Sequence, residues 1–174
     1  MLIPIEKVKS IDDFAKYDNE TLERKLKAIE VAIRSYTHNK FQNRNVRFLA
    51  TSLDGKINGI TKYLKVGDTV EISKTMNSGL YVIKEITDTD IVLDKELYEE
   101  LDNMVTKIEY PEDIVEGALD ILRWDLGMKG KIGIASESLS RHSVTYQNLD
   151  SSNTIEGRPA VLFGFCNPYM KARF

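Results

Sequence analysis

Residues 69–93, with the sequence TVEISKTMNSGLYVIKEITDTDIVL, set the β character of the middle of this chain. The stretch contains three short runs rich in Val, Ile, Thr and Tyr, which are the residue types most typical of β-strands. Turn-forming residues separate these runs at 77–79 (NSG) and at 87–90 (TDTD). In the first run Val70 and Ile72 alternate with polar residues, which predicts a strand with one buried face.

Similar runs lie on both sides of this stretch, at 46–52 (VRFLATS), 60–64 (ITKYL) and 105–109 (VTKIE). Short strands at this spacing favour a small antiparallel barrel or a curled sheet. We therefore assign residues 46–107 to an inserted β module. The acidic run at 94–103 (DKELYEELDN) is expected to add a helical turn before the last strand.

An amphipathic helix is predicted on each side of the β module. The first, over 20–38, has Asp18 and Asn19 as candidate caps. Its apolar residues recur at spacings of three and four: Leu22, Leu26, Ile29, Ile33 and Tyr36. The second, over 111–126, begins at a proline, which suits the first helical position, and is followed by glycine. A shorter helix is expected at 11–17.

These patterns predict an α+β fold. It consists of a small helical bundle of two long helices plus short ones, an inserted small antiparallel β-barrel-like module, and an extended C-terminal tail. The expected helical core is formed by residues 1–45 and 108–133. Residues 134–174 are expected to form an extended segment and a C-terminal docking tail. A length of 174 residues fits one domain with a smaller module built in.

Composition and charge exclude several classes of function. The net charge is −3, and residues 45–110 carry 8 basic and 12 acidic groups, which disfavours a phosphate-gripping surface there. We expect no metal site, because two histidines and one cysteine are too few for a His- or Cys-based centre. We expect no cofactor, because no glycine-rich phosphate-binding motif occurs. No stretch is long and apolar enough to cross a membrane.

Residues 131–150 place several serines around His142, one of two histidines in the chain. A catalytic interpretation pairs Ser140 with His142, which would share one face of a strand. However, the G-x-S-x-G motif is missing, and no acidic residue follows at a fixed spacing that would identify it as the group that orients the histidine. The structural interpretation is a pair of extended segments over 134–148, whose hydroxyls bond to neighbouring backbone groups. We favour the structural interpretation.

The C-terminus is rich in large apolar residues. Phe163, Phe165, Tyr169, Met170 and Phe174 fall within twelve residues. One interpretation is a final strand packed on the core of the protein itself. The other is a segment that docks onto a partner, because aromatic residues, Met and Arg are enriched at interface cores.

Four motifs in order resemble the head–tail connector adaptors of long-tailed bacteriophages, also called head-completion proteins. They are IRSYTHNKFQNRN at 33–45, YPEDIVEGALDILRWDL at 110–126, KIGIASESLSRHSVTY at 131–146 and GRPAVLFGFCNPYMKARF at 157–174. The resemblance covers most of the chain outside the β module. Each motif alone is weakly specific, and their order carries the resemblance.

The resemblance implies a structural role without enzymatic activity. It implies a ring, expected to be a dodecamer, that lies under the portal protein in the virion and assembles in the host cytoplasm. A stopper or other tail component would dock onto the ring, and DNA would pass through it without specific binding. The implied portal-docking residues are Phe165, Pro168, Tyr169, Lys171, Arg173 and Phe174. The implied contacts between subunits involve Ser138, Ser140, Val144 and Tyr146.

The β module departs from the resemblance, since compact adaptors carry a loop at this place. Its presence keeps a second hypothesis open, in which the module binds nucleic acid. Such a surface would need basic grooves and exposed aromatic residues, and the acidic charge of the module disfavours it. A serine hydrolase built around Ser140 and His142 is a third hypothesis.

Overall fold

The computed structural model describes residues 2–59, 62–127, 136–139, 142–145 and 153–172, with the backbone alone at 136–139 and 142–145. The chain divides into two compact units. The first, here called the barrel unit, comprises Met1–Lys7 and Lys40–Pro111. The second, here called the helical unit, comprises Val8–Asn39 and Glu112–Phe174.

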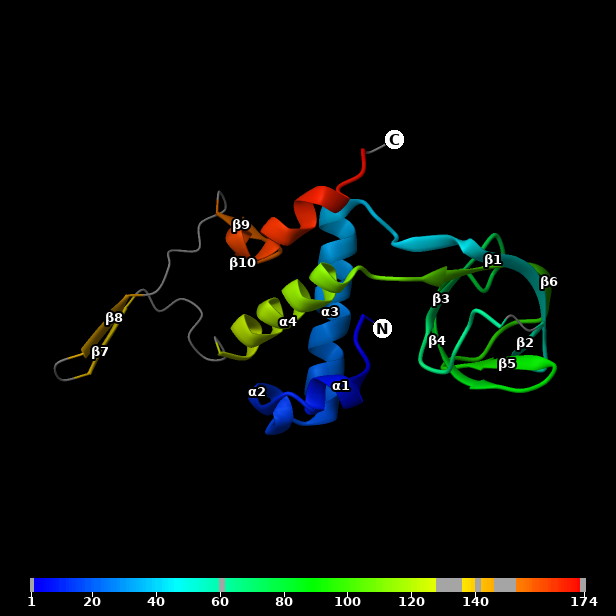
Figure 1. Ribbon diagram of the computed structural model, residues 1–174, viewed down its shortest axis with the longest axis horizontal. Helices are drawn as coiled ribbons and strands as arrows, with labels where there is room; N and C mark the ends of the chain where they lie inside the picture. Colours follow the sequence, from blue (N-terminus) through cyan, green and yellow to red (C-terminus); the bar gives the residue numbers. More distant parts are fainter. Residues whose placement is uncertain (1, 60–61, 128–135, 140–141, 146–152, 173–174) are drawn as a thin grey trace. The chain divides into compact units, whose positions relative to one another are not determined.

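The barrel unit contains a closed antiparallel barrel of six strands (Figure 1). The strands are β1 (Gln42–Leu53), β2 (Lys56–Asn58), β3 (Thr69–Ser73), β4 (Gly79–Ile86), β5 (Asp90–Leu93) and β6 (Glu100–Ile108). Their order around the barrel is β1-β2-β5-β4-β3-β6, and β6 pairs with β1 to close it. Each strand therefore has a partner on both sides, with β2 covering β1 at Thr51–Leu53.

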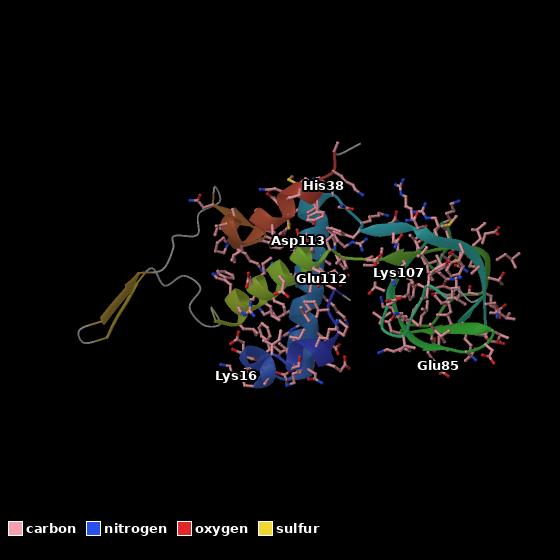
Figure 2. The ribbon with its side chains drawn as sticks, in the orientation of Figure 1. Lys16, His38, Glu85, Lys107, Glu112 and Asp113 are labelled. Atoms are coloured by element: carbon pink, nitrogen blue, oxygen red, sulfur yellow. The ribbon has the colours of Figure 1, made fainter. Side chains whose placement is uncertain are left out.

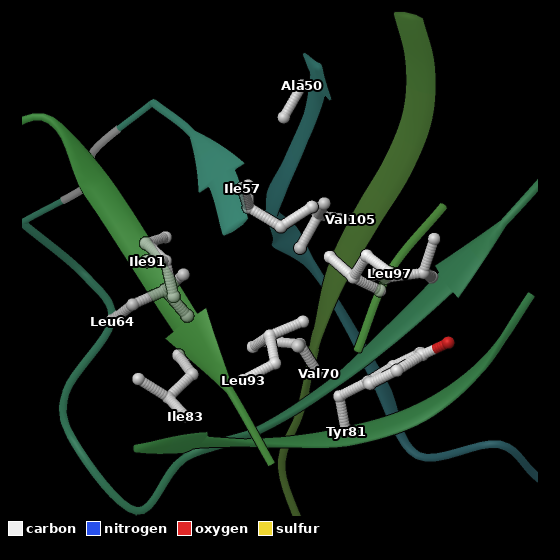
Figure 3. Packing of buried hydrophobic residues seen from close by; sticks show 11 residues of the cluster. Ala50, Ile57, Leu64, Val70, Tyr81, Ile83, Ile91, Leu93, Leu97 and Val105 are labelled. Carbon is white, nitrogen blue, oxygen red and sulfur yellow. The ribbon is translucent and has the colours of Figure 1, made fainter. Parts of the chain in front are cut away.

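Aliphatic side chains from all six strands fill the barrel (Figure 3). Val70 and Ile72 of β3 are both 1% exposed, as their alternation with polar residues predicts. The buried core cluster consists of Ala50, Ile57, Leu64, Val70, Ile72, Tyr81, Ile83, Ile91, Leu93, Leu97 and Val105. Glu71, on the other face of β3, is also buried, because Lys40 Nζ and Gln42 Nε2 bond to its carboxylate at 2.8 and 2.7 Å.

The helical turn expected within residues 94–103 is wrong. Residues 94–99 are irregular, and β6 begins at Glu100. β6 pairs with both β1 and β3, so it is the strand that closes the barrel. The ladder hydrogen bonds gained on both sides outweigh the local helical preference of a run rich in Glu and Leu.

The remaining elements are α1 (Ile5–Lys9), α2 (Asp12–Ala15), α3 (Asn19–Thr37), α4 (Glu112–Gly127), β7 (Ser136–Leu139), β8 (His142–Thr145), β9 (Thr154–Ile155), β10 (Arg158–Pro159) and the 3₁₀ helix η1 (Ala160–Tyr169). The sequence predicted α3 and α4 to within one residue at each end. Asp18 caps α3 by accepting a 2.7 Å hydrogen bond from the Thr21 amide. The predicted apolar face of α3 is buried, with Leu22, Leu26, Ile29 and Ile33 at 0% exposure.

The C-terminal residues fold back on the helices of their own unit. η1 packs against both α3 and α4, and the side chains of Phe163 and Cys166 are fully buried. The Phe163 ring meets Tyr36 of α3 edge-on, with centroids 5.6 Å apart. η1 spans ten residues, which is long for a 3₁₀ helix, and its packing on α3 and α4 stabilises it.

The expected fold class is therefore wrong. The long helices α3 and α4 run in different directions instead of lying side by side as a helical bundle (Figure 1). The β module is a closed barrel that forms a compact unit with residues from Met1–Lys7 as well. The predicted extended tail is a 3₁₀ helix, because its apolar residues lower their free energy by covering α3 and α4.

Candidate functional site

A buried ion pair anchors the C-terminal segment to the helical unit. Arg158 of β10 donates two hydrogen bonds to Asp125 of α4, from Nε to Oδ1 at 2.7 Å and from Nη2 to Oδ2 at 2.8 Å. The Asp125 side chain is 4% exposed, and Lys25 Nζ of α3 lies 3.5 Å from its Oδ2. Since this fork geometry satisfies both oxygens of a buried carboxylate, it holds β10 and the start of η1 against α3 and α4.

Further bonds hold the end of η1. The Tyr169 hydroxyl donates to Asp113 Oδ1 and Oδ2 at 2.7 and 2.8 Å, and Asp113 lies at the start of α4 (Figure 2). Asn39 Nδ2 donates to the Tyr169 carbonyl at 3.1 Å. The Lys171 amide donates to the carbonyl of Thr37 at 2.8 Å. The chain is thus fixed as far as Lys171 by contacts within its own unit.

The expected portal-docking residues fall into three groups. Phe165 and Tyr169 lie on the side of η1 that faces α4, on Gly117 and Asp113 respectively. Pro168 and Lys171 are exposed. Arg173 and Phe174 lie outside the described residues.

The solvent-facing side of the C-terminal segment also carries exposed apolar side chains. The sequence analysis did not name Val161, and it grouped Met170 with residues that are buried. Val161 is 76% exposed and Met170 is 49% exposed. A groove of about 450 Å³ lies nearby, between α3 and the β9–β10 turn. It is lined by Lys27, Ala28, Val31, Ala32, Ser35, Glu156 and Arg158.

The contact between Phe165 and Gly117 gives a direct test of this packing. A Cβ atom on Gly117 would lie 2.3 Å from Phe165 Cδ1, so Gly117→Ala must push the ring off α4. Elsewhere in a helix, glycine to alanine adds about 1 kcal/mol of stability. We expect Gly117→Ala to lose that gain and to lower the thermal midpoint. Gly127→Ala on the same helix is the control, since nothing lies within 4 Å of its new Cβ; equal gains from both variants would contradict the packing.

Cys166 reports whether η1 is docked. Burial, with a smaller contribution from the Asp113 carboxylate, raises the pKa of its thiol to about 12. Because the thiolate is the reactive form, the native protein should react with a thiol reagent at pH 8 at least a hundredfold more slowly than the urea-unfolded chain, on the order of the difference in thiolate fraction. Absorbance of the released chromophore measures the rate. Reaction at the unfolded rate would show that η1 is not docked.

The hydrogen bond from Tyr169 to Asp113 predicts a pH dependence. This bond, then burial and the charge of Asp113, raise the pKa of Tyr169 above its ordinary value of 10. A raised folded-state pKa adds stability that is fully present below pH 10 and is lost as the pH rises through the folded-state pKa. Tyr169→Phe should therefore lower the thermal midpoint between pH 7 and 9, and the difference from wild type should vanish at higher pH. A difference that stays constant across this range would argue against the bond.

The residues expected at contacts between subunits lie in or beside a hairpin. β7 and β8 pair in antiparallel fashion, with Ser138 opposite Ser143 and Val144 opposite Glu137. This agrees with the pair of extended segments predicted there. Ser140 and Tyr146 lie outside the described residues. His142 is opposite Leu139 in the backbone register, and the pairing of Ser140 with His142 as nucleophile and base stays a hypothesis.

The barrel unit contains a buried polar cluster that the sequence analysis missed. Asn77 Nδ2 lies 2.9 Å from the Tyr98 carbonyl, 3.1 Å from Ser52 Oγ and 3.1 Å from Asn103 Oδ1. Asn77 Oδ1 accepts from the Tyr98 amide at 2.8 Å. The Ser52 hydroxyl in turn lies 2.5 Å from the Tyr98 carbonyl. We call Ser52, Asn77 and Asn103 the polar cluster; it ties the irregular segment at 94–99 to β1 and β6.

Four exposed apolar side chains lie on the outside of the barrel, on the segments that the polar cluster joins: β1, the start of β6 and the irregular segment before it. Leu49 and Leu53 lie on the outer face of β1, and they are 58% and 48% exposed. Leu101 is 75% exposed, and its carbonyl accepts a hydrogen bond from Thr51 Oγ1, midway between the two leucines. Tyr98 is 65% exposed, and its backbone bonds to the residue before Leu53. We call these four residues the apolar patch.

The sequence contains a weak signal for the apolar patch and none for the polar cluster. Leu49 and Leu53 are each one residue from an inward-facing position of β1, Ala50 and Ser52 respectively, so a correct strand register would have placed them on the outer face. Asn77 sits in a segment that we interpreted as a turn. Its side chain meets Ser52 and Asn103 only because distant strands converge in the closed barrel.

No protein-family model matches the chain, and no curated protein matches it. Across the described ranges, no three His, Cys, Asp or Glu side chains gather in a way that could hold a metal ion. None of the helices in the described part of the chain has the length and apolar character that spanning a bilayer requires.

Proposed function

We propose that the protein is a structural adaptor of a bacteriophage head–tail connector. Copies of the chain form a ring, expected to be a dodecamer, beneath the portal in the virion. DNA passes through the ring without specific binding, and a stopper or tail component docks onto it. The role is structural and involves no catalysis.

The observation that carries this proposal is that each compact unit has its own exposed apolar side chains. The barrel unit has the apolar patch, and the helical unit has Val31, Val161 and Met170. Exposed apolar groups become favourable when a partner removes them from water, at roughly 25 cal/mol per Å² before the costs of association. A chain with two such surfaces can hold two different partners at once, which is what an adaptor does.

The portal side of the adaptor is assigned to the outer side of the C-terminal segment. Pro168, Met170 and Lys171 are exposed there, next to Arg173 and Phe174 in the sequence. Phe165 and Tyr169 support this surface from beneath through their contacts with α4. The hairpin with Ser138 and Val144, together with Ser140 and Tyr146, is assigned to contacts between neighbouring subunits.

The proposal is tested by mixing the purified protein with the portal protein encoded in the same genome. Negative-stain microscopy and sedimentation should show the protein added to one face of the portal ring. The double variant Val161→Asp/Met170→Asp should fail to add, because it places charges on the docking side of η1. Val66→Asp is the matched control, since Val66 is a 62% exposed valine of the barrel unit. Absence of binding by the wild type, or unchanged binding of the double variant, would refute the proposal.

A further inference from the structure

We infer that the apolar patch of the barrel is a docking surface for a basic segment of another protein, whose large apolar side chains contact Leu49, Leu53, Tyr98 and Leu101. This inference concerns the barrel unit and stands without the portal assignment. It gives the β module, for which the resemblance offers no role, a binding partner of defined chemistry.

The backbone beneath the patch is built to expose it. Between the pairs Ala50–Asn103 and Ser52–Glu100, β1 advances two residues and β6 advances three. β6 therefore carries one extra residue here, a β-bulge, and both Leu101 and Asp102 are exposed. Bulges turn side chains that a regular ladder would direct to alternate faces, and they are common beside functional sites.

The polar cluster makes the patch rigid. It fixes the backbone of Tyr98 through both its amide and its carbonyl, and the amide of Glu100 donates to Ser52 Oγ at 3.1 Å. The three side chains of the cluster are at most 2% exposed. A surface held in place before a partner arrives loses little conformational entropy on binding, which favours affinity.

A groove and an acidic rim lie beside the patch. The groove has a volume of about 510 Å³ and is formed by the β1–β2 turn and residues 92–97. Residues 53–56 and 94–102 contain six acidic residues and two lysines. One of these lysines, Lys95, already donates to the Leu80 carbonyl at 2.9 Å and lies 5.3 Å from the Tyr81 ring centroid. The rim is therefore strongly negative.

The chemistry of this surface selects its partner. A second copy docked through the same patch would bring two acidic rims together, and like charges oppose that arrangement. Nucleic acid is disfavoured for the same reason. Addition of a strand beside Leu53 is blocked, because β1 pairs there with β2 on one side and with β6 on the other. In a segment with Lys or Arg flanking large apolar side chains, the basic groups can pair with the acidic rim while the apolar side chains cover the apolar patch.

Fluorescence anisotropy with a labelled peptide of sequence KLKFKLK tests the inference on the full-length protein. We expect saturable binding that weakens as salt is raised, and no binding of the peptide ELEFELE. Leu101→Ser should raise the dissociation constant about tenfold, the scale of a residue at the centre of an interface. Val66→Ser, which also replaces an exposed apolar residue of the barrel unit, should leave it unchanged.

The charged rim has its own matched pair of variants. Glu99→Gln/Asp102→Asn should weaken peptide binding, whereas Glu85→Gln, on β4 of the same barrel (Figure 2), should not. Equal binding of both peptides, equal affinity of Leu101→Ser and Val66→Ser, or saturable binding of a labelled oligothymidylate would overturn the inference. Circular dichroism of each variant establishes that the fold is retained.

Discussion

Replacing Asn77 with alanine should lower the free energy of unfolding of the barrel unit by about 3 kcal/mol. The amide side chain of Asn77 bonds to both backbone groups of Tyr98 and lies within hydrogen-bond distance of Ser52 and Asn103. Its removal leaves the amide and the carbonyl of Tyr98 without the Asn77 side chain as a partner. Because Asn77 is 2% exposed in the native protein, bulk water does not reach these groups to replace the lost hydrogen bonds. We expect the segment at 94–99 to detach from β1 first.

Hydrogen exchange and urea unfolding measure this effect separately in each compact unit. Exchange should accelerate in β1 and β6, while α3 and α4 keep their wild-type protection. Asn58→Ala is the matched control, because Asn58 is an exposed residue of the same barrel whose side chain bonds to Asp90 at 2.6 Å. The control should change stability by less than about 0.5 kcal/mol. Similar losses in both variants would mean that the polar cluster does not support the barrel.

Replacing Arg158 with methionine should destabilise the helical unit by about 3 kcal/mol. Methionine keeps the unbranched apolar stem of the side chain but removes both hydrogen bonds to Asp125, a carboxylate that is 4% exposed in the native protein and has Lys25 Nζ at 3.5 Å. A buried carboxylate that has lost its two strong hydrogen bonds destabilises a protein more than replacement of both partners by apolar side chains does. The double variant Arg158→Met/Asp125→Leu should therefore recover most of the loss.

The thiol of Cys166 provides a second measurement for Arg158→Met. Because Arg158 lies two residues before the start of η1, its loss should free the segment and speed the reaction of Cys166 with a thiol reagent at pH 8. Arg123→Met is the control, since Arg123 bonds to Asp13 and Asp120 on the surface and is 40% exposed. That variant should cost less than about 1 kcal/mol and leave the thiol protected. A single variant Arg158→Met as stable as the double variant would contradict the anchoring role of the ion pair.

The corrected features of the fold share one cause, which is that long-range pairing decided them. The acidic run at 94–103 has a local preference for helix, but β6 gains two neighbouring strands by being extended. The apolar C-terminal segment offered two interpretations, and packing on α3 and α4 favours a 3₁₀ helix over an extended tail. Neither outcome depends on residues close in the sequence, so periodicity and turn signals could not reveal it.

The sequence by itself determined the two long helices, through the cap at Asp18 and the buried row from Leu22 to Ile33, and the β character of the stretch from Val46 to Ile108. Those signals are local, because a helix repeats every 3.6 residues and a strand every two. The tertiary structure alone decided the closure of the barrel, the meeting of Ser52, Asn77 and Asn103, and the pairing of Arg158 with Asp125. Each of these joins residues at least 25 positions apart, and only the burial of distant apolar surfaces against one another brings such residues together.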